Sequence, residues 1–164
     1  MHPQRIEPGP GQESVWDYPR PPALEDTTQH IQVLFNGVII AETHRAKRVL
    51  ETSHPPSYYI PPDDVLSGCL QPTRRSTVCE WKGSATYFSV VVGDRCAENA
   101  AWSYPHPSDR FASLQNYIAF YPSAMAACYV DGELVQAQAG DFYGGWVTEA
   151  IVGPFKGGAG TWGW

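Results

Sequence analysis

Residues 31–41, IQVLFNGVIIA, contain two apolar runs that are joined by Asn-Gly. Both residues of an Asn-Gly pair tolerate positive φ, so this pair is the strongest short signal for a two-residue β-hairpin turn. Such a turn places Phe35 opposite Val38 and Val33 opposite Ile40. Apolar residues occupy both faces of the predicted hairpin, so we expect other parts of the chain to cover it on both sides.

Further strands are predicted beyond this hairpin. Residues 128–135, CYVDGELV, form a second apolar run with Asp-Gly at its turn. Residues 86–93 and 117–121 are rich in β-branched and aromatic residues, which is typical of strands, and Phe88, Val90 and Val92 fall on one side of the first. Helix is scarce, with one short turn predicted at 43–50 and another at 108–114, where Ser108 is the candidate N-cap. The sequence therefore predicts a mainly β protein with few short helices.

Composition changes along the chain and suggests three parts. Residues 1–28 are rich in proline, which fixes φ and deters helix, so we expect an extended arm anchored by Trp16 and Tyr18. Residues 29–138 carry the strand patterns and form the predicted β domain. Residues 139–164 are rich in glycine and aromatic residues, and this tail should pack on the domain or on a partner subunit, because buried indoles stabilise by about 2 kcal/mol each.

Charge and hydropathy argue against several function classes. The chain of 164 residues has a net charge of -6 and 11 Lys and Arg, which gives no basic stripe for nucleic acid or for an anionic membrane. Its apolar runs are much shorter than the roughly 20 residues of a membrane span. The first residues lack the apolar core of a secretory signal, so we expect a cytoplasmic protein.

The cysteine spacing does not favour a metal centre. The four cysteines are separated by 10, 17 and 32 positions, without a Cys-x-x-Cys pair, so no zinc knuckle and no metal is expected. Without an export signal we expect free thiols. Asp63 and Asp64 are adjacent and should point apart, so we interpret them as a helix start after Pro62 and not as metal ligands.

Three polar residues are candidates for catalysis. His54 lies in a proline-stiffened segment and could act as a general base, and the alternative, which we favour for an isolated histidine, is a Pro-rich turn whose aromatic residues cover a sheet edge. Cys79 could be a nucleophile if His54 or Lys82 lowers its pKa, and the alternative is a small buried residue at a strand start. Lys82 precedes a glycine and could place a charge or an amine in a cleft, or it could be an exposed lysine beside a bulge.

Aromatic residues recur close to these polar ones. Residues 101–107, AWSYPHP, predict a rigid loop that could form one wall of a cavity. Rings around a cavity bind planar or cationic small molecules by stacking and by cation-π attraction, whereas an aromatic-rich core is the alternative. The candidate ligand-binding residues are Tyr58, Tyr59, Trp81, Trp102, Tyr104, Phe120 and Tyr121.

Four segments together resemble a known family. They are ETSHPPSYY (51–59), CEWKG (79–83), AWSYP (101–105) and IAFY (118–121), and their order and spacing are similar to the family of domain of unknown function 427 (DUF427). The resemblance covers roughly residues 31–135. The arm and the Gly/Trp-rich tail resemble the longer, bacterial form of this family.

The resemblance implies a single small domain of two antiparallel sheets that lean together, similar to the β-tent or Mss4-like group. Some relatives in that wider group bind zinc through paired cysteines, and others use an aromatic cage or a reactive cysteine. This chain lacks the paired cysteines, so zinc is not carried over. The family has also carried a nucleotidyltransferase label, but we find neither the carboxylate spacing nor the phosphate cradle that phosphoryl transfer needs.

Three functional hypotheses follow. The leading one is a β domain whose cleft, lined by aromatic rings and Lys82, binds a small planar or anionic metabolite. The second is an enzyme that uses Cys79 as nucleophile or Lys82 as amine, with His54 transferring protons. The third is a structural or assembly protein that forms a homodimer through the arm or the tail. No cofactor is expected in any of the three.

Overall fold

The computed structural model describes residues 3–140 and 142–164, and its fold is mainly β, as predicted. The strands in chain order are β1 (Glu13–Ser14), β2 (Ala23–Asp26), β3 (Ile31–Phe35), β4 (Val38–Thr43), β5 (Lys47–Leu50), β6 (Ser57–Tyr59), β7 (Leu70–Cys79), β8 (Gly83–Val92), β9 (Arg95–Ser103), β10 (Ala119–Phe120), β11 (Ala127–Val130), β12 (Glu133–Leu134), β13 (Gln136–Ala137), β14 (Trp146–Val147) and β15 (Ile151–Val152). Short 3-10 helices occur at η1 (Val15–Asp17), η2 (Pro62–Asp64), η3 (Asp109–Leu114) and η4 (Pro122–Ala124). Within these described residues, no helix is long and apolar enough to cross a bilayer.

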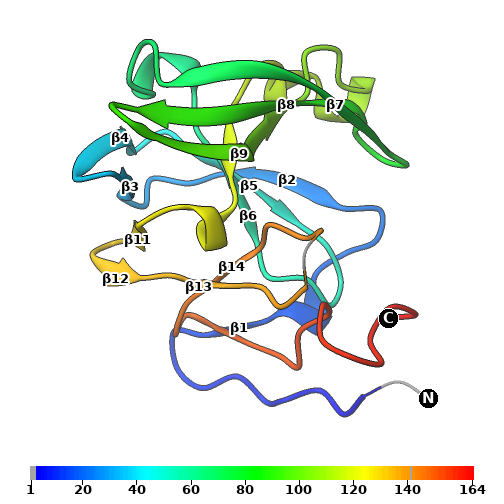
Figure 1. Ribbon diagram of the computed structural model, residues 1–164. Coiled ribbons are helices and arrows are strands. Elements are labelled where there is room, and N and C mark those ends of the chain that lie inside the picture. The colour runs from blue at the N-terminus through cyan, green and yellow to red at the C-terminus, as the bar shows by residue number, and fades with distance from the viewer. Residues whose placement is uncertain (1–2, 141) are drawn as a thin grey trace.

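Two antiparallel four-stranded sheets enclose the main hydrophobic core (Figure 1). One has the strand order β12-β11-β3-β4, and the other has the order β10-β9-β8-β7. Ile31 of β3 and Val90 of β8 are fully buried between the sheets, and Trp146 of β14 joins the same core from the tail. Each large apolar side chain buried in this way stabilises the fold by about 1.5–3 kcal/mol.

The predicted hairpin turns are both present. Their central residues have the positive φ that the sequence implies, with values of 49° at Asn36, 75° at Gly37, 50° at Asp131 and 80° at Gly132. The two hairpins lie next to each other, because β11 pairs with β3 in the same sheet. Turn chemistry alone therefore specifies four strands of the fold.

The register of the first hairpin differs from the prediction away from its turn. Phe35 pairs with Val38 as expected. A β-bulge between Val33 and Leu34 then shifts the pairing, so Val33 lies opposite Ala41 and the predicted pairing with Ile40 is wrong. A bulge adds one residue to one strand, which a simple alternation pattern does not reveal.

The helix predicted at 43–50 is wrong. Residues 47–50 form β5, the central strand of the sheet β2-β5-β6, because pairing on both edges outweighs a weak helix propensity. At 108–114 the structure has η3, but the Ser108 side chain does not cap it. Residues 101–103, predicted as loop, instead continue β9, whereas the short helix start at 62–64 is confirmed as η2.

A second hydrophobic cluster lies on the other face of the sheet β10-β9-β8-β7. The sheet β2-β5-β6 and η3 cover this face, and Figure 1 shows β2, β5 and β6 beneath the green strands β7–β9. Tyr87 of β8 and Trp102 of β9 are cross-strand neighbours in this cluster. Tyr59 of β6 faces them from the covering sheet. This aromatic cluster forms the floor of the candidate site described below.

The N-terminal arm and the C-terminal tail pack on this same chain. In the arm, β1 pairs in parallel with β15 of the tail, and β2 pairs with β5 of the β domain. The Trp16 indole donates a hydrogen bond to the carbonyl of Pro154 at 2.7 Å, and its ring lies 5.6 Å from that of Trp164. Trp162, in contrast, is 87% exposed.

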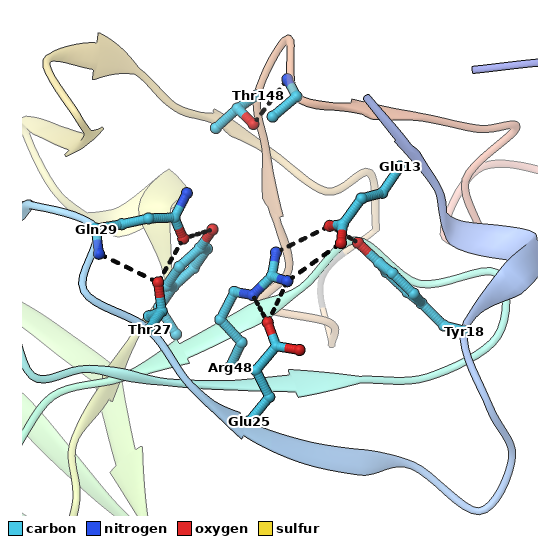
Figure 2. Close-up of polar contacts among 9 residues, drawn as sticks. Glu13, Tyr18, Glu25, Thr27, Gln29, Arg48 and Thr148 are labelled. Carbon is cyan, nitrogen blue, oxygen red and sulfur yellow. Dashed lines mark hydrogen bonds and ion pairs between the residues drawn. The ribbon is translucent and has the colours of Figure 1, made fainter. Parts of the chain in front are cut away.

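A buried arginine fastens the arm to the domain (Figure 2). The Arg48 guanidinium on β5 donates hydrogen bonds to the carboxylates of Glu13 and Glu25, which belong to β1 and β2. Tyr18 also donates to Glu13, at 3.0 Å. The fork geometry of arginine suits two carboxylates at once, so this one side chain links two segments of the arm.

Candidate functional site

A pocket of about 270 Å³ opens beside the aromatic cluster. Its walls come from β6, from the turn between β7 and β8, from β9 and from the tail. Among the residues singled out in the sequence, it is lined by His54, Tyr59, Cys79, Trp81, Lys82, Trp102, Tyr104 and Tyr121. The structure thus brings together side chains that lie up to 67 positions apart in the chain (from His54 to Tyr121).

The turn between β7 and β8 directs Lys82 into this pocket. Cys79 pairs with Gly83 across the turn, and Gly83 has a φ of 107°, which favours glycine. Two hydrogen bonds from Ser108 hold the turn in place: its backbone N–H donates to the Lys82 carbonyl at 3.0 Å and its hydroxyl donates to the Trp81 carbonyl at 2.7 Å. A lysine in a hairpin turn is ordinarily solvated, but this one is only 9% exposed.

The buried Lys82 ammonium lacks a carboxylate partner. None of the ion pairs among residues 3–140 and 142–164 includes it. Its Nζ lies 5.6 Å from the centre of the Tyr104 ring, a cation-π contact. Burial acts to lower the pKa of Lys82, but the neighbouring Tyr59 and Cys79 outweigh burial and raise the pKa above its ordinary value. Lys82 is therefore a cation at neutral pH, which makes it a poor amine nucleophile.

The floor of the pocket is a fixed set of rings. The Trp102 indole donates a hydrogen bond to the Tyr59 hydroxyl at 3.2 Å, and the two rings meet edge to face with centroids 6.1 Å apart. Burial raises the pKa of Tyr59 and of Tyr104, so both are neutral phenols. Tyr121 packs against Trp102 at 4.5 Å between centroids. These contacts fix the rings of the pocket against one another.

His54 lines the pocket as a neutral imidazole. Burial, followed by the positive charges of Lys156, Arg20 and Lys82, lowers the pKa of His54 to about 4. Glu51 Oε2 is 3.7 Å from His54 Nε2, too far for a hydrogen bond, and Arg20 already donates to that oxygen, so Glu51 does not reverse the shift. With such a low pKa, His54 is a weak general base at neutral pH.

Gln138 sets the proton position on His54. The Gln138 side-chain oxygen accepts from the backbone N–H of Gly145 at 3.1 Å, and its nitrogen donates to the Lys156 carbonyl at 2.7 Å. The same nitrogen lies 3.4 Å from His54 Nδ1. Because this nitrogen is a donor, His54 Nδ1 is the acceptor and Nε2 carries the proton in the neutral ring.

The tail supplies the remaining wall. Tyr143 lies edge-on to His54 with ring centroids 5.0 Å apart, and the Tyr121 hydroxyl donates to the carbonyl of Phe142 at 3.2 Å. Gly144 lies against the Trp102 ring, and a Cβ at this position would be 2.3 Å from Trp102 Cη2. Only glycine lets the backbone approach the indole so closely.

Two of the aromatic residues predicted to bind ligand lie outside the pocket. Tyr58 packs in the main core against Trp146, with ring centroids 5.0 Å apart, and its hydroxyl donates to Gln29. Phe120 is also fully buried in that core. Successive side chains of a strand point to opposite faces, so Tyr59 and Tyr121 reach the pocket while Tyr58 and Phe120 point away from it. We therefore exclude Tyr58 and Phe120 from the candidate site.

Several pocket residues were not singled out from the sequence. They include Tyr87 of β8 and, from the tail, Gln138, Phe142, Tyr143, Gly144 and Lys156. Side chains alternate along β8, so Tyr87 lies on the same face as Ala85, and this alternation could have identified Tyr87 from the sequence. The tail residues carry no motif, because their position depends on how the tail returns to β6 and β9.

The structure provides no cluster of metal ligands in the residues that it describes. The carboxylates that line the pocket are Glu51 and Glu80, and no second acidic pair joins them there. Asp64 is bonded instead to Thr43 and Arg45, which lower its pKa. The polar groups that line the pocket are therefore one thiol, two lysines, a neutral histidine, two carboxylates, two hydroxyls and one amide, beside the tyrosine and tryptophan rings.

Comparison with models of known protein families gives a match. A search of curated proteins finds no similar sequence. A family model described as "Domain of unknown function (DUF427)" matches residues 23–131, which include β2 to β11, the turn that carries Lys82, and the aromatic floor of the pocket. This match extends over more than half of the chain, and the protein therefore belongs to the DUF427 family.

Proposed function

We propose that the pocket binds a small planar molecule that carries an anionic group. The single observation that carries this proposal is Lys82: a cation that is 9% exposed, has no ion pair in the part of the chain that the structure describes, and lines the pocket. A buried ammonium without a carboxylate partner can be neutralised by the anionic group of a ligand, which supports the proposal.

The rings define the rest of the ligand. Tyr59, Trp102 and Tyr104 form a buried floor, while Trp81 and Tyr121 are partly exposed and stand nearer to solvent. Aromatic rings that line a pocket favour an aromatic or conjugated ligand. A volume of about 270 Å³ suits a ligand of one or two rings and is at the small end of ligand sites.

The electrostatics favour binding over acid–base catalysis. Lys82 is protonated, and His54 is neutral with a pKa of about 4, so neither is poised to transfer a proton near pH 7.

The homodimer that would support an assembly role stays a prediction. In the single chain the arm and the tail already pair with each other through β1 and β15.

Thermal shift with matched acid and amide pairs tests this proposal. Benzoate is compared with benzamide, and indole-3-acetate with indole-3-acetamide, on wild type, Lys82→Met, Trp81→Ala and the control Trp162→Ala, which changes an exposed indole outside the pocket. At about 100 times the Kd, a ligand adds about 2.7 kcal/mol to the free energy of unfolding. We expect at least one acid to raise the Tm of wild type and of Trp162→Ala by several degrees, its amide to do so less, and Lys82→Met and Trp81→Ala to lose the effect. Equal shifts in all four proteins, or none for any acid, would contradict the proposal.

A further inference from the structure

Cys79 shares the pocket with Lys82. Cys79 ends β7, Lys82 lies in the turn that follows, and both side chains line the pocket. Cys79 is partly exposed, so a small molecule in the pocket can reach its sulfur. The turn is held by Ser108, which keeps the thiol and the ammonium on the same wall.

This pairing has a chemical consequence. The sulfur of a cysteine is a nucleophile, and Lys82 places an ammonium in the same pocket as this sulfur. The same ammonium attracts the carboxylate of an entering molecule and so brings the carbons close to that carboxylate, including the β-carbon of an unsaturated acid, near the sulfur. Holding two reactants side by side accelerates their reaction even when no further catalytic group takes part.

We propose that Cys79 is a nucleophile toward carbon electrophiles that carry a carboxylate, and that Lys82 holds this carboxylate while the sulfur attacks. The inference rests on the proposed function, because it uses Lys82 as the anion-binding group of the same pocket. The chemical class is that of α,β-unsaturated carboxylic acids. Such a reaction would extend the function of the pocket from reversible binding to covalent capture.

The addition balances without any other reactant. The Cys79 sulfur forms a bond to the β-carbon of the unsaturated acid, and the π-electron pair of the C=C bond moves to the α-carbon. The α-carbon then takes up the proton that the thiol released. The product is a thioether, and nothing leaves and nothing is oxidised or reduced.

The test uses two alkylating probes of nearly equal size and different charge, iodoacetate and iodoacetamide. Each forms a carbon–sulfur bond as iodide leaves. Cys96 is exposed and serves as the reference within the same molecule. Cys69 and Cys128 are buried, and burial raises the pKa of both thiols, that of Cys128 to about 12, so neither competes in the native protein. Mass spectrometry of the digested protein gives the labelling rate of Cys79 and Cys96 separately.

The measured quantity is the rate with iodoacetate divided by the rate with iodoacetamide. We expect this ratio to be roughly tenfold higher at Cys79 than at Cys96, the factor that corresponds to about 1.4 kcal/mol. Lys82→Met should lower the ratio at Cys79 to that of Cys96, and Lys82→Arg, which keeps the cation, should retain most of it. A ratio at Cys79 equal to that at Cys96 in wild type, or one that Lys82→Met leaves unchanged, overturns the inference.

A measurement on wild type alone covers the case in which a variant does not fold. Salt screens the attraction between the entering anion and Lys82, so raising the NaCl concentration should bring the ratio at Cys79 toward that of Cys96. A high ratio at Cys79 that salt does not lower would contradict the role of Lys82. The two proposals can fail separately: if aromatic acids still stabilise wild type but not Lys82→Met, while the labelling ratios are equal, binding stands and covalent capture is rejected.

Discussion

At the scale of single residues, Lys82 is the side chain that the fold alone does not explain. It is buried in a hairpin turn, where a lysine would normally reach water, and the described chain places no carboxylate against it. Residues that lower stability are commonly retained at binding sites. The stability of Lys82 variants therefore distinguishes a functional cation from a structural one.

Replacement of Lys82 by methionine should stabilise the protein in the absence of ligand. At pH 7 Tyr59 is neutral, so its charge does not offset the desolvation of the ammonium. Methionine keeps most of the volume without the charge, and we expect the free energy of unfolding to rise by about 1 kcal/mol. Urea denaturation at pH 7 measures it, with Lys47→Met as the control, since Lys47 forms an ion pair with Asp26. A loss of stability in Lys82→Met larger than in Lys47→Met would show that the charge has a structural role.

His54 should make stability fall in acid. Its pKa is about 4 in the folded protein and about 6.5 in the unfolded chain, so between these values the unfolded chain binds the proton and the folded protein does not. Titration of His54 thus leaves the free energy of unfolding unchanged above pH 6.5. It lowers this free energy by up to about 3 kcal/mol as the pH falls toward 4. His54→Gln should remove this part of the pH dependence in denaturation curves at pH 7 and pH 4.5. Identical pH dependence in wild type and variant would contradict the neutral, buried state of His54.

At the scale of the elements, local signals predict turns well and predict strand pairing poorly. Asn-Gly and Asp-Gly specify the two hairpins because the turn residues themselves adopt positive φ. The sequence pattern did not predict the strand β7, because Pro72, Arg74 and Arg75 are untypical of a strand inside a sheet. β7 lies at the edge of its sheet, where proline and charged residues are tolerated. The strand β5 was mistaken for helix because its state depends on β2 and β6. The convergence of Trp81, Lys82 and Trp102 was predictable as a hypothesis, whereas the tail wall depends on long-range packing that no short motif encodes.

The tail wall should not tolerate a side chain at position 144. In Gly144→Ala the new Cβ would lie 2.3 Å from Trp102 Cη2, so either the tail or the indole must move, at a cost of about 1–3 kcal/mol. We expect a lower Tm and a weaker shift with the aromatic acid that stabilises wild type. Gly163→Ala is the matched control, since a Cβ there meets nothing within 4 Å. Equal Tm values for the two variants would mean that the tail does not contact the indole in solution.

At the scale of the whole molecule, the arm, the β domain and the tail form one packed unit. The arm is held by Arg48 (Figure 2) and by pairing of β1 with β15, and the tail lines the pocket beside Trp102 of β9. The pocket is lined by residues of the β domain and of the tail, so it requires the tail to be in place. The complete pocket therefore forms only when the tail is packed on the folded β domain.

Loss of Arg48 should loosen the arm. In Arg48→Met the carboxylates of Glu13 and Glu25 lose their shared partner, and we expect faster amide hydrogen exchange at residues 13–26 and a loss of roughly 1–3 kcal/mol in stability. Arg110→Met changes an exposed arginine and should leave exchange in the arm unchanged. Unaltered exchange in Arg48→Met would contradict the role of this side chain as the link between arm and domain.

A crystal structure of the protein with the aromatic acid that gives the largest thermal shift tests the central claim most directly. The claim predicts that the acid lies in the pocket, with its carboxylate within about 3 Å of Lys82 Nζ and its ring against Trp81 or Trp102. The claim is contradicted if the acid binds elsewhere on the molecule, or if Lys82 turns out to solvent and leaves the pocket without a charge.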